Sequence, residues 1–292
     1  MLRLSLATAA GRIGLAIVAI HLFVAVFGSF LAPYSATEFH LVPEYSEEHQ
    51  LSGPSSTYLL GSDQFGRDVF SRVLTGARSL ISISIAGALL GIFLGTVVGM
   101  SSGYKGGKVD EVVMRIMDGL MAFPVLLLAL LVLTTLGARD APGWIEPWWE
   151  PVLIVLTIGV VFMPHIARVL RSVTLQAKTQ EFVMSARLRG ESAPYIIFRE
   201  ILPNAVPILA VQFSVQFSYA ILVVSSLGFL GLGVQPPSPD WGLMINEGRA
   251  FVSVAPWMAL APAGAVASLV VGVNLLSDGI KQASGLPRGI TQ

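Results

Sequence analysis

The chain has 292 residues, of which 54% are hydrophobic and 12% are charged, about half the charged fraction of an ordinary soluble domain. The absence of cysteine excludes a disulfide framework, a thiolate nucleophile and a Cys-ligated metal, and the zero formal net charge excludes a general nucleic-acid footprint. Apolar runs of about 20 residues recur and predict an all-α integral membrane protein with six transmembrane helices. The expected spans are 13–32, 79–102, 113–136, 151–172, 205–232 and 254–277.

The first apolar run is followed by a polar segment, LGSDQFGRDVFSR, that leads into the second span. Asp63 with Arg67, and Asp68 with Arg72, have the i,i+4 spacing that brings opposite charges together on a helix. Apolar residues lie between the charges. The segment is therefore predicted to be an amphipathic helix at the outer membrane surface.

The second span carries glycine at every fourth position, at Gly87, Gly91, Gly95 and Gly99. These positions share one helix face, and the absence of Cβ atoms there lets a neighbouring helix approach closely. Internal helix packing is the first interpretation. The alternative is a face that lines a pathway of changing width.

The third span follows the cytoplasmic sequence GYKGGKVDE. Asp110 and Glu111 suit the first turn of a helix because they face its positive dipole end, Glu111 forms an i,i+4 pair with Arg115, and Pro124 predicts a kink. The glycine and lysine spacing does not match a phosphate-binding loop, and no strand precedes it. Nucleotide binding by this chain is therefore not expected.

The polar interval from Glu181 to Asn204 separates the fourth and fifth spans and is longer than an ordinary connector. Gly190 splits it into two helical pieces, and Ser192 is a suitable N-cap for the second piece. This length predicts a docking element for something outside the membrane. Its basic residues, which favour the cytoplasmic side, are Arg187, Arg189 and Arg199.

The fifth span presents polar residues on one predicted face, at Gln212, Gln216 and Tyr219. Buried amides need partners, which can be neighbouring helices or a water-filled path. Asn274 on the last span is a further candidate for a substrate pathway. After the fifth span, the run Pro236-Pro237-Ser238-Pro239 predicts a stiff extended stretch, and Trp241 an interfacial anchor.

The distribution of charge predicts that both termini are cytoplasmic. With that orientation 13 of the 18 Lys and Arg residues lie inside, as the positive-inside rule requires, and all five tryptophans lie near the outer interface. Charged residues are nearly absent from the middle of the spans, so no coupling of transport to protons or sodium is evident. The basic residues expected outside are Arg67, Arg72, Arg78, Arg139 and Arg249.

These motifs resemble the permease subunits of bacterial ABC importers of the dipeptide, oligopeptide and nickel type, from about residue 11 to 282. The strongest blocks are LGSDQFGRDVFSR and the polar interval, which is similar to the coupling loop of these permeases. Met184 stands where glutamate is frequent in the family, and Glu200 where histidine is usual. The ending Ser284-Gly285-Leu286-Pro287 also departs from the family pattern.

The resemblance implies a type I importer permease fold in a bacterial inner membrane. It divides the chain into 1–78, with the first span and an extracytoplasmic segment, a transmembrane domain over 79–278 with its coupling loop at about 181–204, and a tail over 279–292. It also assigns contact with an extracytoplasmic binding protein to Asp63, Arg67, Asp68, Asn246 and Arg249. The residues it assigns to coupling are Glu181, Ala186, Arg187, Gly190, Leu202 and Pro203.

The implied function is ATP-driven import of peptides, with this chain as half of the pathway and no catalytic residue of its own. Its expected partners are a second permease, ATPase subunits that bind the ATP, a binding protein and the lipid bilayer. Nickel, glutathione-like compounds and opine or sugar conjugates are alternative cargoes. An autonomous channel or secondary transporter is the rival class, and it would require midplane charges or paired broken helices. A membrane enzyme would need a nucleophile or metal cluster, whereas His21, His40, His49 and His165 are scattered.

Overall fold

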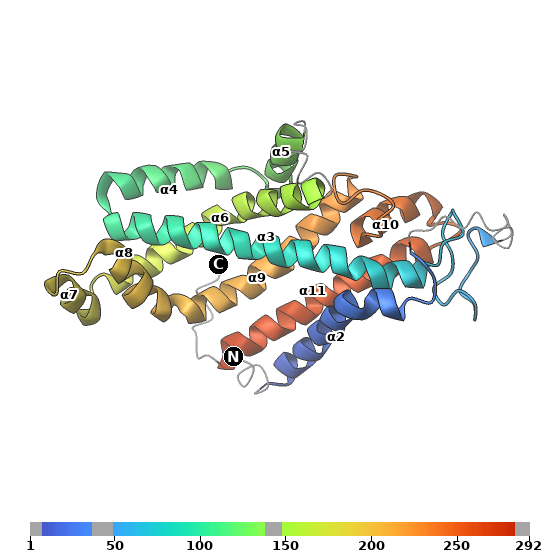
Figure 1. Cartoon of the computed structure of the whole chain (residues 1–292), viewed down its shortest axis with the longest axis horizontal. Coiled ribbons are helices and arrows are strands. Elements are labelled where there is room, and N and C mark those ends of the chain that lie inside the picture. The colour runs from blue at the N-terminus through green and yellow to red at the C-terminus, as the bar shows by residue number, and fades with distance from the viewer. Residues whose placement is uncertain (1–7, 37–48, 138–147, 284–292) are drawn as a thin grey trace. The chain divides into compact units, whose positions relative to one another are not determined.

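The computed structural model describes residues 8–36, 49–137 and 148–283, and most of this part of the chain is helical (Figure 1). Five of its helices are long and apolar enough to cross a membrane. The helices are α2 (Ala9–Leu31), α3 (Val69–Lys105), α4 (Gly107–Met121), α5 (Val125–Gly137), α6 (Trp149–Ala177), α7 (Glu181–Leu188), α8 (Ala193–Tyr195), η3 (Ile196–Ile201), α9 (Leu202–Phe229), α10 (Trp241–Gly248), η4 (Arg249–Phe251) and α11 (Trp257–Ala283).

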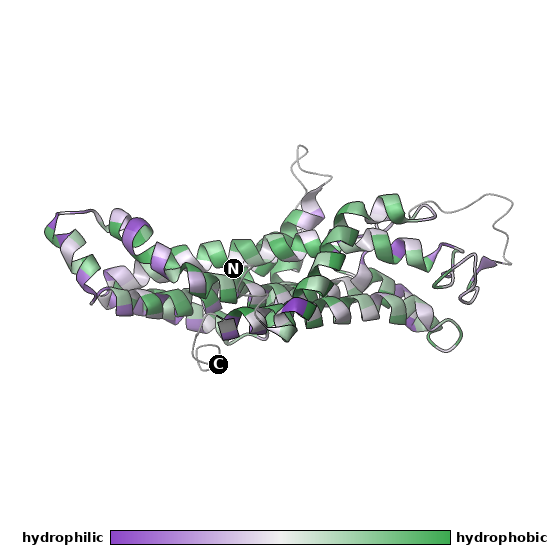
Figure 2. Cartoon of the chain, turned by 90° about the horizontal axis from the view of Figure 1, so that it is seen from below, coloured by the Kyte–Doolittle hydropathy of each residue, from purple (hydrophilic) through white to green (hydrophobic). Residues whose placement is uncertain are grey.

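The hydropathy of these helices fits the predicted spans, and the long helices are mainly hydrophobic along their lengths (Figure 2). The predicted third span, 113–136, is not straight. Its two halves, α4 and α5, are bent by 96° at a break that ends at Pro124. Proline has no N–H to donate and disfavours helical geometry in the residue before it, so the helix ends ahead of Pro124. The pair counts as a sixth span only as a broken one.

The second half of the predicted docking interval also differs from expectation. Ser192 occupies the predicted N-cap position of α8, but its side chain makes no capping hydrogen bond. From Ala193 to Phe229, α8, η3 and α9 then continue as a single helical stretch. Within it, η3 is a π-helical insertion from Ile196 to Ile201. The polar interval therefore consists of one separate helix, α7, followed by the first turns of the fifth span.

Contacts divide the chain into two compact units. The first comprises 1–85, 141–154 and 217–292, and the second comprises 86–140 and 155–216. In the first unit, α2 and α10 both pack against α11. A Cβ atom at Gly14 would overlap the backbone of α11 at Leu276, and one at Gly272 would meet Ile17 of α2. Small residues therefore allow α2 and α11 to approach closely.

In the second unit, α3 packs against α6 along the predicted glycine stripe. Cβ atoms at Gly87, Gly91 and Gly95 would lie 2.5–3.0 Å from side-chain atoms of α6, and one at Gly99 would overlap the carbonyl of Ala167. Real Cβ atoms essentially never make contacts shorter than 3.0 Å, so Gly87, Gly95 and Gly99 are required by the close approach of the two helices, and the contact at Gly91 is at this limit. The interpretation as internal helix packing is confirmed.

Candidate functional site

The first helix of the polar interval, α7, ends in a defined C-terminal turn. Gly190 has a φ angle of +80°, in the left-handed region that favours glycine. Its N–H donates to the carbonyl of Arg187 over 2.9 Å, and the N–H of Glu191 donates to the carbonyl of Ala186 over 3.2 Å. This pair of bonds is a Schellman motif. The predicted break at Gly190 is confirmed.

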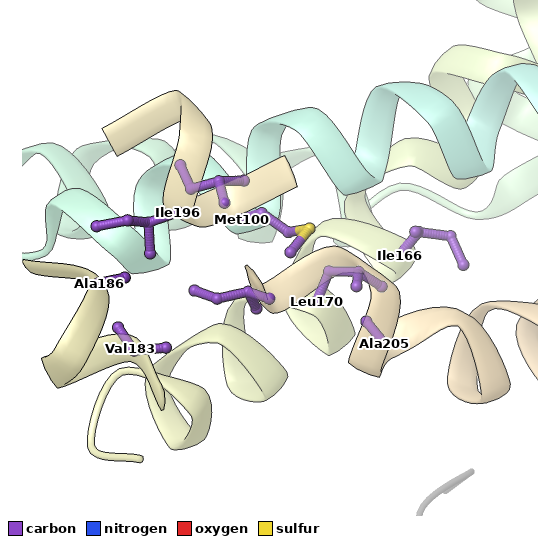
Figure 3. Close-up of a cluster of buried hydrophobic side chains, with 9 residues drawn as sticks. Met100, Ile166, Leu170, Val183, Ala186, Ile196 and Ala205 are labelled. Carbon is purple, nitrogen blue, oxygen red and sulfur yellow. The ribbon is translucent and has the colours of Figure 1, made fainter. Parts of the chain in front are cut away.

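One face of α7 is anchored in the core of the second unit. Val183 and Ala186 are fully buried, and their neighbours in the cluster come from α3, α6, η3 and α9 (Figure 3). Ala186, which the resemblance assigns to coupling, therefore packs against the chain's own helices. The labelled members of this cluster are Met100, Ile166, Leu170, Val183, Ala186, Ile196 and Ala205.

The other side of α7 is exposed and carries large apolar side chains among the polar side chains of Glu181 and Ser185. The side chain of Leu188 is 90% exposed and that of Met184 is 50% exposed. Phe198 of η3 and Tyr195 of α8 add two exposed aromatic rings that follow α7 in the chain. Apolar groups that gather on a surface next to polar residues mark interaction sites in proteins.

Two cations meet an aromatic ring beside α7. The guanidinium carbon of Arg187 lies 5.2 Å from the centre of the Tyr104 ring at the end of α3, and the Nζ of Lys178 lies 5.7 Å from the same centre. Lys178 also donates to the carbonyl of Gly103 over 3.2 Å. The importance of Tyr104 was missed from the sequence, because 83 positions separate Tyr104 from Arg187 and no periodicity links them.

The remaining residues predicted for coupling occupy the two ends of the interval. Glu181 is exposed in the first turn of α7, where a carboxylate faces the positive end of the helix dipole. Leu202 is partly buried against the core cluster, and Pro203 is exposed. Glu200, which stands where the family usually has histidine, accepts a hydrogen bond from Arg189 over 3.1 Å. This ion pair ties the turn after α7 to η3.

Ion pairs between α4 and α6 border a surface groove of about 440 Å³ in the second unit. Arg171 donates to both carboxylate oxygens of Asp110 over 2.6–2.9 Å, and Arg168 pairs with Asp118. Asp110 lies in the first turn of α4, as predicted. Both arginines that α6 contributes to this groove are therefore paired with acidic residues of α4.

The polar face predicted on the fifth span does not share one environment. Gln212 and Gln216 are buried, with exposed fractions of 2% and 4%, whereas Tyr219 is 58% exposed. The Oε1 of Gln212 has no hydrogen-bond partner within the described residues. Asn274 is exposed and accepts a hydrogen bond from Ser218 over 3.0 Å. The α9 and α11 polar groups in the first unit are thus partly paired with each other.

The segment before α3 is not the predicted surface helix, because α3 begins only at Val69 and the preceding residues form turns with an isolated bridge between Ser62 and Asp68. The ion pair between Asp63 and Arg67 forms at 2.7 Å, but both side chains are only 1% exposed. Asp68 instead accepts hydrogen bonds from the backbone N–H and hydroxyl of Ser71, as a helix cap does. These three charged residues do not present their side chains to the outside.

Arg72 completes a buried quartet of charges with a residue far along the chain. It donates to Asp63 over 2.6 Å and to Glu247 of α10 over 2.8 Å, and Arg67 reaches the same Glu247 oxygen over 3.3 Å. Two guanidinium groups and two carboxylates give no net charge. The quartet, defined as Asp63, Arg67, Arg72 and Glu247, holds α10 against the start of α3.

Around α10, the predicted anchor and loop residues are mostly engaged within the chain. Trp241 is 1% exposed and donates from its indole to the carbonyl of Val73 over 2.8 Å, so it does not anchor at a lipid interface. Asn246 donates to the carbonyl of Phe229, and the guanidinium of Arg249 lies 5.6 Å from the centre of the Phe229 ring. The backbone turns at Pro236-Pro237 and does not continue as an extended run.

Asp240 precedes this helix as its N-cap and accepts hydrogen bonds from the N–H groups of Gly242 and Leu243 over 2.9 and 3.3 Å. Burial raises the pKa of Asp240 to about 6, although the two N–H donors act in the opposite direction. Its second carboxylate oxygen is buried without a hydrogen-bond partner among the described residues. The described residues also contain no group of three or more His, Asp or Glu side chains arranged to hold a metal ion.

Some predicted residues lie outside the part of the chain that the structure describes. They are His40, Arg139, Trp144 and the ending Ser284-Gly285-Leu286-Pro287.

Comparison with known proteins identifies the scaffold that carries α7. Residues 91–284 match the family described as "Binding-protein-dependent transport system inner membrane component". The glutathione transport system permease protein GsiD of Pectobacterium atrosepticum is 38% identical over 97% of this chain and 87% of its own length. The dipeptide transport system permease protein DppC of Alkalihalophilus pseudofirmus is 35% identical over 93% of this chain and 84% of its own. With its apolar helices, this chain belongs to the family of inner-membrane permease components of binding-protein-dependent transport systems.

Proposed function

We propose that this chain forms half of the translocation pathway of an ATP-driven importer, and that α7 is its docking element for an ATPase subunit. The single observation that carries the proposal is the two-sided character of α7. Its inner face, at Val183 and Ala186, is fixed in the chain's own core, while Leu188 and Met184 are exposed on the outside. A short helix built in this way can be moved by a partner and transmit the movement inward.

The expected orientation of the chain favours a cytoplasmic partner. The excess of Lys and Arg predicts that both termini and the polar interval 181–204 are cytoplasmic. ATP would be bound by the partner, and its closure on ATP would displace α7 together with the core cluster. The proposed division of the chain is an N-terminal and extracytoplasmic part at 1–78, the transmembrane domain at 79–278 and a cytoplasmic tail at 279–292.

Peptides are the proposed cargo, because relatives of this chain are named for dipeptide and glutathione transport, and glutathione is itself a peptide. Nickel and opine or sugar conjugates stay as alternatives. Gln212, Gln216, Tyr219 and Asn274 are the proposed pathway residues. Tyr219 and Asn274 are exposed on this chain and can contact a passing substrate. Gln212 is buried, and its side-chain oxygen has no hydrogen-bond partner among the described residues, so a polar neighbour there would be favourable.

The proposed contact with an extracytoplasmic binding protein falls on Arg249, whose side chain is exposed at the end of α10. Asn246 would contribute indirectly, because its side chain donates a hydrogen bond to the carbonyl of Phe229, whose ring contacts Arg249. Asp63, Arg67 and Asp68 would act indirectly, by holding the segment before α3 in place.

The docking proposal is tested by placing a charge on the exposed side of α7. Leu188→Asp should abolish recovery of ATPase subunits with the purified chain, because a carboxylate in an apolar interface loses its hydration. Leu59→Asp is the matched control, since Leu59 is also exposed, at 56%, and lies in the segment expected outside the membrane. Normal ATPase recovery with Leu188→Asp would contradict the assignment of α7.

A further inference from the structure

We propose that Tyr104 is a positioning residue that makes α7 and the turn between α3 and α4 move as one body when the ATPase acts. The inference rests on the proposed function, because it concerns how the movement of α7 is transmitted. Its structural basis is the pair of cations, Arg187 and Lys178, that lie 5.2 and 5.7 Å from the centre of the Tyr104 ring. Both distances are within the range of a cation–π interaction.

The contact fixes α7 where backbone connectivity does not. Arg187 lies one position before Leu188, whose side chain is 90% exposed, and the carbonyl of Arg187 accepts the hydrogen bond that closes the helix at Gly190. Arg187 makes no ion pair with an acidic side chain within the described residues. The face of Tyr104 is therefore the interaction that orients this guanidinium toward α3.

Tyr104 is itself held by rigid neighbours. Gly103 packs against α6, where a Cβ atom would lie 3.1 Å from the carbonyl of Arg171. The side chain of Arg171 in turn binds Asp110 in the first turn of α4. A displacement of α7 that pulls on Tyr104 thus reaches the beginning of α4 through backbone packing and a bidentate ion pair.

The core cluster and the Tyr104 contact have different roles. Val183 and Ala186 provide non-directional apolar packing, which tolerates small sliding movements of one helix over another. The contact between Arg187 and Tyr104 lies on the side of α7 toward the α3 end and resists such sliding. Without it, we expect α7 to stay folded on the core but to slip relative to α4.

The experiment uses the absence of native cysteine in this chain, so that within this chain the labels attach only at the two introduced sites. Ser185→Cys on α7 and Lys108→Cys at the start of α4 are exposed positions for spin labels. The distance between the labels is measured by pulsed electron resonance in the complex purified with its ATPase subunits. Samples without nucleotide are compared with samples trapped by ATP and vanadate.

We expect the interlabel distance to be the same in both states for the native ring and for Tyr104→Phe, which keeps the aromatic face. In Tyr104→Leu, the interlabel distance with ATP and vanadate should differ from that without nucleotide by about 1–2 Å or more, which is the size of helix shifts at an interface. Arg187→Met should give the same shift, and because Arg187 is exposed this variant also serves if Tyr104→Leu does not fold.

Unchanged distances in both Tyr104→Leu and Arg187→Met would overturn the positioning role. A shift in Tyr104→Phe as large as in Tyr104→Leu would also overturn it, because the ring face would then not be the determinant. These results are distinguishable from failure of the docking proposal, in which no ATPase subunits are recovered with the native chain.

Discussion

Loss of Glu247 is the perturbation whose effect the structure defines most sharply. Its Oε2 accepts hydrogen bonds from Arg72 over 2.8 Å and from Arg67 over 3.3 Å, and both guanidinium groups are at most 3% exposed. Glu247→Gln keeps the shape of the side chain but leaves the quartet with two guanidinium groups and the single carboxylate of Asp63. An uncompensated positive charge then remains on two guanidinium groups whose side chains are almost fully buried.

Removing one partner of a buried ion pair costs about 3–5 kcal/mol of folding free energy. Glu247 is 16% exposed, so water offsets part of the loss, and the lower figure of about 3 kcal/mol is expected. For a chain of this size that corresponds to a fall in Tm of roughly 5–10 °C. The assay is thermal unfolding of the detergent-solubilised protein, followed by tryptophan fluorescence.

A matched control and a compensating variant separate charge from shape. Glu111→Gln breaks an exposed pair with Arg115, whose side chains are 69% and 80% exposed, and should change Tm little. Adding Arg67→Leu to Glu247→Gln restores neutrality, so the double variant should be more stable than the sum of the two single losses predicts. Equal Tm values for Glu247→Gln and Glu111→Gln, or strictly additive losses, would refute the reasoning.

Three further predictions follow from the geometry of single residues. Gly99→Ala places a methyl group against Ala167 and should lower the free energy of unfolding by about 1–3 kcal/mol. Gly119→Ala is the control, because its methyl group would meet nothing within 4 Å, and it should leave Tm equal or higher. Equal losses of Tm in the two variants would contradict the packing argument. Burial raises the pKa of Asp240 in the folded state to about 6 from 3.8, so the folded state holds this proton more tightly than the unfolded state does. The stability gained from the protonated carboxyl is therefore fully present below about pH 4 and is lost as the pH rises through 6, and the free energy of unfolding falls by up to about 3 kcal/mol. Asp240→Asn should flatten this pH dependence of Tm, and an unchanged pH profile would exclude Asp240 as its source. Gly190 has a φ angle of +80°, which asparagine tolerates and valine does not. Gly190→Val should therefore reduce ATP-driven uptake, whereas Gly190→Asn should retain it. Equal uptake by both variants would contradict the role of the turn.

Features with a local physical cause could be predicted from the sequence. Apolar runs predicted the long helices, and a glycine period of four predicted the close packing of α3 on α6. The turn at Gly190 was predictable because a left-handed residue that closes a helix is usually glycine.

Features that depend on tertiary contacts were predicted less well. The i,i+4 spacing predicted an ion pair between Arg72 and Asp68. Arg72 instead binds Asp63 and Glu247, which is 175 positions away in the sequence. Pro124 indicated a break between α4 and α5, but a proline in the sequence does not specify the angle of 96° between them. The contact of Arg187 with Tyr104 joins distant segments and has no periodic signature. For the same reason, the predicted polar face of α9 did not show that Gln212 would be buried and Tyr219 exposed.

The central claim is that this permease works with ATPase subunits docked on α7. The most direct measurement is gentle detergent purification of the chain from its native host, followed by mass spectrometry of the proteins that stay bound. The account predicts recovery of a second permease and ATPase subunits. Recovery of this chain alone as a homo-oligomer, with no ATPase subunit, would contradict it and favour an autonomous channel or carrier.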